Sequence, residues 1–254
     1  MKIETSMSLT PPDFFEPIRQ TSERRWQQLE ADPELAGPWH QLFKQVQSPR
    51  HVLSELLQNA DDAGATEASA EIDNGLFVFS HNGEDFKPDH FASLCRFGYS
   101  NKRSLHTIGF RGIGFKSTFS LGPVVKIQTP SLSVSFEKER FTLPCWQDER
   151  EKIDSQTTRI LVQIQDELRE SELKKNLAEW QQSPVSLLFF RSLRKLRINS
   201  HELYWEHLGF PRFGGQVGRR NAMTTRLLID DQPKPCTPAV HTAAKGGSCC
   251  PLPG

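Results

Sequence analysis

Hydrophobic residues follow two different spacings along this chain, and each spacing predicts a different kind of element. Over residues 12–31 they recur every three or four positions, which is typical of a helix that buries one face. The same spacing predicts further helices at residues 39–48, 53–63, 88–97, 166–182 and 184–193. We therefore expect helices in both halves of the chain.

Strict alternation of apolar and polar residues takes over after Gly64. It predicts one strand through Ala68, Ala70 and Ile72 and a second at residues 76–79, with a tight Asp-Asn-Gly turn between them. Alternating or β-branched stretches predict more strands at residues 124–129, 132–137, 158–164 and 194–199. Residues 141–146 are expected to cross the surface between two of these strands.

The predicted helix at residues 53–63 carries polar residues along one side. Glu55, Asn59 and Asp62 stand at i, i+4 and i+7, and such positions form one stripe on a helix. Leucine and alanine fill the rest of the helix, so the stripe requires either a partner or a chemical task. The alternative is a solvated acidic stripe that ends at a Gly64 cap. His51, just before the helix, is interpreted as a boundary or packing residue.

A glycine-rich segment with the sequence TIGFRGIGFKS occupies residues 107–117 and leads into a predicted helix. Glycines allow the backbone to approach an anion closely, and the free N–H groups at the start of a helix point towards that anion. The segment is therefore a candidate phosphate-binding loop.

The helix sequence ELLQNADDAGAT and the loop sequence IGFRGIGFKSTF lie about 50 residues apart. As a pair they resemble the ATP-binding domain shared by gyrase, the ninety-kilodalton heat-shock chaperone, histidine kinases and MutL, known as the GHKL superfamily. The two motif sequences are most similar to those of the sacsin and No-Vein type, and the resemblance covers roughly residues 35–165. The resemblance implies an α/β (α+β) fold of the Bergerat type, a two-layer sandwich of a mixed, mostly antiparallel sheet with helices on one face.

The resemblance also implies roles for individual residues. Glu55 would orient and deprotonate the attacking water, and Asn59 would ligate Mg²⁺ through its amide oxygen. Lys116 is expected to meet phosphate, whereas Lys102 either does the same or is an ordinary exposed lysine. Residues 98–103 would form a lid that closes on the ligand. Besides the base-binding residues, the implied ATP-binding residues are Asn59, Asp62, Ala63, Lys102, Gly109, Arg111, Gly112, Ile113, Gly114, Phe115, Lys116 and Ser117.

The base-binding box departs from the pattern of the superfamily. Its members carry Asp-x-Gly-x-Gly, and the aspartate accepts a hydrogen bond from the adenine amine. In this chain His81 stands at the aspartate position, Gly83 keeps the first glycine and Asp85 replaces the second. Either His81 or Asn82 accepts the adenine N–H, or base recognition is weakened or lost. Thr158 begins a strand that resembles the one carrying a threonine near the adenine, or it is an ordinary strand residue.

Charge and cysteine content narrow the class of function. The 31 basic and 31 acidic side chains balance, which argues against a general electrostatic binder of nucleic acid or membranes, and so against a DNA-processing component like MutL. The five cysteines show no CxxC spacing, and reduced cysteines in the cytoplasm are their simplest explanation. No window offers the roughly 18 apolar residues that a membrane span needs. We expect a cytoplasmic protein.

Three regions are predicted from these patterns. Residues 1–34 form a helical extension, residues 35–200 form the ATP-binding domain, and residues 201–254 form a poorly structured tail rich in Pro, Gly, Ser and Thr. Superfamily members of this type usually continue into further domains, so the chain is expected to be truncated or frame-shifted near its end. The adjacent Cys249 and Cys250 do not by themselves indicate metal binding or lipidation.

The leading functional hypothesis is an ATP-binding module of the sacsin or Hsp90-like type. Mg²⁺-dependent ATP hydrolysis would drive lid closure and a conformational change, in a chaperone-like or regulatory role towards an unknown protein client or a further domain. The alternative is a nucleotide-binding or protein-interaction module without hydrolysis. Both hypotheses use the same binding residues, so measured turnover separates them.

Overall fold

The computed structural model describes residues 7–32, 34, 48–96, 114–150, 156–207, 225–229 and 232–233. The strands of its main sheet are β2 (Glu67–Asp73), β3 (Leu76–His81), β4 (Val124–Gln128), β5 (Ser133–Glu137), β6 (Pro144–Trp146), β8 (Thr158–Gln163), β9 (Lys195–Ile198), β10 (His201–His207), β11 (Thr225–Ile229) and β12 (Gln232–Pro233). β1 (Met7–Ser8) and β7 (Glu149–Arg150) form a separate antiparallel pair.

The order of the main sheet, within the described residues, is β12-β11-β10-β9-β2-β3-β8-β4-β5-β6. β2 and β9 pair in parallel, and the other neighbouring strands of this part of the chain pair antiparallel. The predicted mixed, mostly antiparallel sheet is therefore confirmed. β10 and β11 continue the sheet beyond residue 200, where a domain boundary is predicted.

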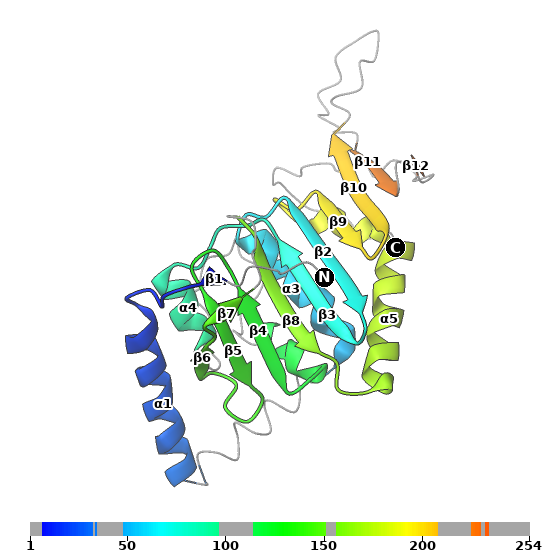
Figure 1. Cartoon of the computed structure of the whole chain (residues 1–254). Coiled ribbons are helices and arrows are strands. Elements are labelled where there is room, and N and C mark those ends of the chain that lie inside the picture. The colour runs from blue at the N-terminus through cyan, green and yellow to red at the C-terminus, as the bar shows by residue number, and fades with distance from the viewer. Residues whose placement is uncertain are drawn as a thin grey trace, which may run out of the picture.

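Helices form the second layer of the sandwich, and Figure 1 shows α3 behind β2, β3 and β8. The α-helices are α1 (Phe15–Ala31), α3 (Val52–Asp62), α4 (Pro88–Leu94) and α5 (Glu167–Gln182). Short 3₁₀ helices are η1 (Pro49–His51), η2 (Gly114–Ser120) and η3 (Pro184–Phe189). Residues 184–193, predicted as a full helix, thus form a 3₁₀ turn followed by irregular chain. None of the described helices has the length and apolar composition that a membrane crossing requires.

One face of the sheet is apolar because register places buried residues of neighbouring strands side by side. Ala70 lies opposite Phe79, Phe79 opposite Ile160, Ile160 opposite Ile127, and Ile127 opposite Val134. All five are buried. Side chains on a strand alternate between faces, so residues two positions along each strand share this core-facing side.

α3 ends in a cap that its sequence explains. Gly64 adopts a φ of 74°, its N–H donates to the Asp61 carbonyl at 2.9 Å, and the Ala65 N–H donates to the Ala60 carbonyl at 2.9 Å. This pair of bonds is the Schellman arrangement, which satisfies the last carbonyls of a helix. The predicted helix end at Gly64 is therefore confirmed.

Asp61 ties the end of α3 to a segment far away in sequence. Its Oδ1 accepts hydrogen bonds from the backbone N–H groups of Ser192 at 2.7 Å and Leu193 at 2.9 Å, and its Oδ2 accepts one from Arg191 at 3.1 Å. The carboxylate is buried. A buried charge needs such partners, so Asp61 holds the chain between η3 and β9 against α3.

The prediction that residues 141–146 cross the surface is wrong. Phe141, Thr142 and Pro144 are buried, and the segment ends as strand β6. α1 covers it: Trp26 Nε1 donates to Thr142 Oγ1 at 2.8 Å, and the Trp26 and Phe141 rings meet edge to face with centroids 5.4 Å apart. The ring of Phe15 in α1 likewise packs against the Trp146 ring, with the two ring centroids 5.2 Å apart. The N-terminal helix is thus packed against the edge of the sheet.

Candidate functional site

The polar stripe of α3 is more exposed than the apolar residues of the same helix. Glu55, Asn59 and Asp62 are half-buried, as is Ala63 after them. The apolar residues of the same helix are buried, namely Val52, Leu53, Leu56, Leu57 and Ala60. The stripe therefore lines the accessible margin of the helix layer, where side-chain oxygens can meet a ligand.

The end of α3 touches the loop after β3 at Gly83. Glu84 N–H donates to the Ala63 carbonyl at 2.8 Å. A Cβ atom added to Gly83 would lie 2.9 Å from both the Cβ and the carbonyl oxygen of Ala63. Real Cβ atoms do not approach that closely, so glycine is required for this contact. Gly83 thus brings the predicted base-binding box next to the end of the polar stripe of α3.

His81 and Thr158 lie directly opposite each other on β3 and β8. They occupy the face that carries Phe79 and Ile160, two positions along each strand, and therefore face the helix layer. Thr158 is buried and His81 is half-buried. The structure therefore brings Ala63, His81, Gly83 and Thr158 together at one end of the sandwich.

The imidazole of His81 is hydrogen bonded to its own loop. The Gly83 N–H donates to Nδ1 at 3.1 Å. Burial lowers the pKa of His81 to about 4, so the ring is neutral at pH 7. Sequence reasoning missed this bond, although a side-chain acceptor two residues before a glycine N–H matches the spacing of an Asx turn.

Asn82 and Asp85 hold the backbone together around this loop. Asn82 Oδ1 accepts hydrogen bonds from the N–H groups of Thr66 at 2.9 Å and Glu67 at 3.0 Å, and its Nδ2 donates to Thr66 Oγ1 at 2.9 Å. Asp85 uses one oxygen for its neighbour Phe86 N–H, at 2.7 Å, and the other for Ser131 N–H, at 2.9 Å. The residue that replaces the second glycine of the box therefore anchors the loop between β4 and β5.

The glycine-rich segment is described from Gly114 onwards, as η2. Phe115, Lys116 and Ser117 are all buried. Lys116 Nζ donates to the carbonyl of Arg96, just after α4, and lies 5.7 Å from the centroid of the Phe141 ring. Burial lowers the pKa of Lys116 to about 7. The ammonium group is thus turned into the core, and its contact with phosphate stays a prediction.

Part of the predicted site falls outside the described residues. These positions are Lys102, Gly109, Arg111, Gly112 and Ile113, together with the lid segment 98–103. Their predicted contacts with phosphate stay predictions.

Metal ligation by the described residues alone would be incomplete. No group of three or more His, Cys, Asp or Glu side chains gathers in this part of the chain in a way that could hold an ion. Asn59 offers an amide oxygen, which suits Mg²⁺. Mg²⁺ usually keeps several waters and shares phosphate oxygens, so a single protein ligand fits this ion and does not fit a structural metal.

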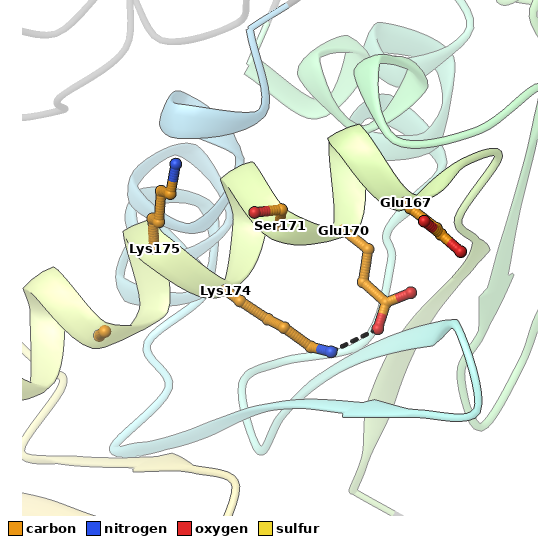
Figure 2. A pocket seen from close by; sticks show the side chains of 6 residues that line it. Glu167, Glu170, Ser171, Lys174 and Lys175 are labelled. Carbon is orange, nitrogen blue, oxygen red and sulfur yellow. Dashed lines mark ion pairs between the residues drawn. The ribbon is translucent and has the colours of Figure 1, made fainter.

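A shallow depression of about 630 Å³ lies elsewhere, on the outer side of α5. Figure 2 shows its side chains projecting from that helix, with Lys174 paired to Glu170 at 2.6 Å. Its other lining residues are Glu167, Ser171, Lys175 and Ala178. None of the predicted site residues lines it, so this depression is separate from the candidate site.

Sacsin and MutL are similar to part of this chain. Human sacsin is 28% identical over 116 residues, covering 38% of this chain and 2% of sacsin. The DNA mismatch repair protein MutL of Pelobacter propionicus is 38% identical over 86 residues, covering 30% of this chain and 14% of that protein. The MutL of Chlorobium chlorochromatii is 41% identical over 87 residues, covering 30% of this chain and 13% of that protein. No family model matches the sequence.

The chain thus spans a small fraction of the length of these relatives. Sacsin and MutL are both GHKL members. The two motifs noted in the sequence contribute α3 and η2 to the fold. Similarity to both proteins, combined with the two-layer sandwich, shows that this chain carries a domain of the GHKL type.

Proposed function

We propose that this domain binds a nucleoside triphosphate of the ATP type together with Mg²⁺ and hydrolyses it. One observation carries the proposal: the half-buried stripe of Glu55, Asn59 and Asp62 ends at Ala63, which contacts Gly83 in the base-binding box. In this proposal, the residues that the resemblance assigns to metal and water follow one side of α3, and those assigned to the base follow its C-terminal end. A triphosphate site needs a general base, a metal ligand and room for the base of the nucleotide, and here Glu55, Asn59 and Gly83 would supply them.

Asn59 would hold Mg²⁺ through its side-chain oxygen, and phosphate oxygens and waters would complete the shell. When bound, the ion would neutralise charge on the phosphates. Asn59 lies one helical turn from both Glu55 and Asp62, so all three can face the same ligand. The glycine-rich loop would contribute backbone N–H groups to the phosphates.

Glu55 would act on the attacking water. A carboxylate at the half-buried margin can accept a proton from water that is held in line with the terminal phosphate. Its position one turn before the metal ligand keeps it on the same side of α3. Removal of this carboxylate would then impair turnover and leave the binding groups in place.

Binding is tested by calorimetric titration of the full chain with ATP, with and without Mg²⁺. We expect binding in Mg²⁺ and much weaker binding after chelation of the metal. Asn59→Ala should abolish the Mg²⁺-dependent part, whereas the control variant Glu71→Gln, on the opposite face of the sheet, should retain it. Equal affinity of wild type and Asn59→Ala in Mg²⁺, with an unchanged circular dichroism spectrum, would refute the metal assignment.

Turnover is tested by phosphate release. Glu55→Gln keeps the side-chain size and should lower the rate by about 100-fold to 10,000-fold while ATP affinity stays the same. Glu71→Gln, on the opposite face of the sheet, is the control and should hydrolyse ATP like wild type. Binding without any release of phosphate by wild type would identify a nucleotide-binding switch in place of an ATPase.

A further inference from the structure

The hydrogen bond at His81 determines which ring nitrogen carries the proton. Gly83 N–H donates to Nδ1 at 3.1 Å, so Nδ1 holds a lone pair at that point and no proton. In a neutral imidazole the proton then sits on Nε2. His81 therefore presents an N–H donor on its outer edge.

This tautomer is locked by the surrounding loop. Gly83 is buried, and its N–H would lose its partner if the ring turned over or if Nδ1 took the proton. The loop is also tied to the end of α3, because the Glu84 N–H donates to the Ala63 carbonyl at 2.8 Å. The donor therefore stays on Nε2.

Nε2 is available to a ligand. Of the two imidazole nitrogens of His81, Nδ1 has a hydrogen-bond partner among the described residues. Nε2 is not one of the fully buried atoms without a partner in this part of the chain. The ring lies on the helix-facing side of β3, opposite Thr158 and next to the Ala63–Gly83 contact. That is the margin at which the proposed nucleotide would place its base.

The other acceptors of the loop are already engaged. Asn82 Oδ1 serves two backbone N–H groups, and the two oxygens of Asp85 serve one each. Glu84 is exposed and forms an ion pair with Lys87 at 2.7 Å. Asn82 and Asp85 are therefore engaged by backbone N–H groups and Glu84 by a surface lysine, and His81 is the side chain that stands at the aspartate position of the superfamily.

We propose that this site selects a 6-oxopurine nucleotide, of the guanine or hypoxanthine class, over a 6-aminopurine nucleotide, with His81 Nε2–H donating to the O6 atom of the base. The inference rests on the proposed function. At the aspartate position an acceptor matches the adenine amine, whereas a donor at the same place opposes that amine and matches a carbonyl oxygen. ATP remains a weaker ligand through its phosphates.

The test is a calorimetric comparison of ATP, inosine triphosphate and GTP on the full chain in saturating Mg²⁺. Inosine triphosphate differs from ATP only in the 6-oxo group and the N1 proton that accompanies it. We expect it to bind about tenfold more tightly than ATP or better, because a mismatched buried polar pair is strongly disfavoured. GTP should follow inosine triphosphate.

Two substitutions separate the donor from the rest of the side chain. Both Asp and Asn accept the Gly83 N–H through an Asx turn, so both preserve the loop. His81→Asp leaves an acceptor facing the base and should reverse the preference towards ATP. His81→Asn leaves its amide N–H₂ facing the base and should keep the preference for inosine triphosphate.

The possible results are distinct. Binding of all three nucleotides with equal affinity, or with ATP preferred by wild type, refutes the base preference and leaves the proposed function standing. An unchanged ratio in His81→Asp also refutes it. Failure of wild type and both variants to bind any of the three refutes nucleotide binding itself, and the base preference with it.

Discussion

Asp61 offers a direct test of how this sandwich is held together. It stands next to Asp62 in the same helix, yet it is buried and accepts three backbone N–H groups from residues 191–193. We predict that Asp61→Ala strongly destabilises the fold because it leaves those N–H groups without an acceptor. Asp61→Asn should have an intermediate effect.

The magnitude follows from the geometry of the three bonds. An amide oxygen in Asp61→Asn can replace Oδ1 for Ser192 and Leu193, but its N–H₂ group then opposes the N–H of Arg191. One lost hydrogen bond to a charged acceptor corresponds to about 1.5 to 3 kcal/mol. Loss of all three in Asp61→Ala should cost about 3 to 5 kcal/mol, because such losses do not add fully. That is a large fraction of the roughly 5 to 15 kcal/mol that stabilises a typical domain.

The measurement is urea unfolding followed by far-ultraviolet circular dichroism. Asp73→Asn, at an exposed carboxylate at the end of β2, is the matched control and should stay within about 0.5 kcal/mol of wild type. An Asp61→Ala protein within about 1 kcal/mol of wild type would show that the three hydrogen bonds contribute little, and the reasoning would be wrong.

Three further predictions concern the loop after β3. Gly83→Ala should destabilise the fold by about 1 to 3 kcal/mol, because the added Cβ clashes with Ala63. Gly64→Ala places nothing within 4 Å of its Cβ and should cost only about 1 kcal/mol of backbone strain. Urea unfolding of both variants measures the two costs. The pKa of His81 falls from 6.5 to about 4 on folding, so the unfolded chain binds the proton first and stability should drop as the pH falls from 6.5 towards 4, by up to about 3 kcal/mol. His81→Asn should remove that part of the pH dependence, and an identical dependence in both proteins would contradict the assignment. Asn82→Ala should lower stability by about 1 to 2 kcal/mol and leave the ratio of ATP to inosine triphosphate affinity unchanged, since its amide serves backbone groups; a changed ratio would make Asn82 a base-reading residue.

Sequence was a sufficient guide wherever adjacent residues decide the local structure. The turn between β2 and β3 needs two residues with positive φ, and Asn74 and Gly75 adopt 49° and 75°. Asp166, the first residue of the predicted helix at 166–182, caps α5 by accepting the Arg169 N–H at 2.9 Å. The polar stripe of α3 was predicted for the same reason, because helical spacing alone places its members on one side.

Sequence was insufficient wherever a distant partner decides the role of a residue. Helical spacing places Asp62 on the polar stripe and Asp61 off it, but only the segment about 130 residues later shows what holds the buried Asp61 carboxylate. Phe141 is buried because Trp26 of α1 covers it, and no local pattern contains that information. The proton on His81 likewise depends on a backbone N–H two residues away and on the burial of Gly83 behind Ala63.

The position of β2 in the sheet has a consequence for the nascent chain. β3 follows it after a two-residue turn, but its parallel partner β9 begins only at Lys195, far beyond Asp73. At ribosomal speed, roughly 6 to 25 seconds pass between the synthesis of these two residues. During that time one edge of β2 has its backbone groups unpaired, and such an edge can recruit a strand from another chain. Intermolecular strand addition therefore competes with completion of the sheet until β9 has emerged.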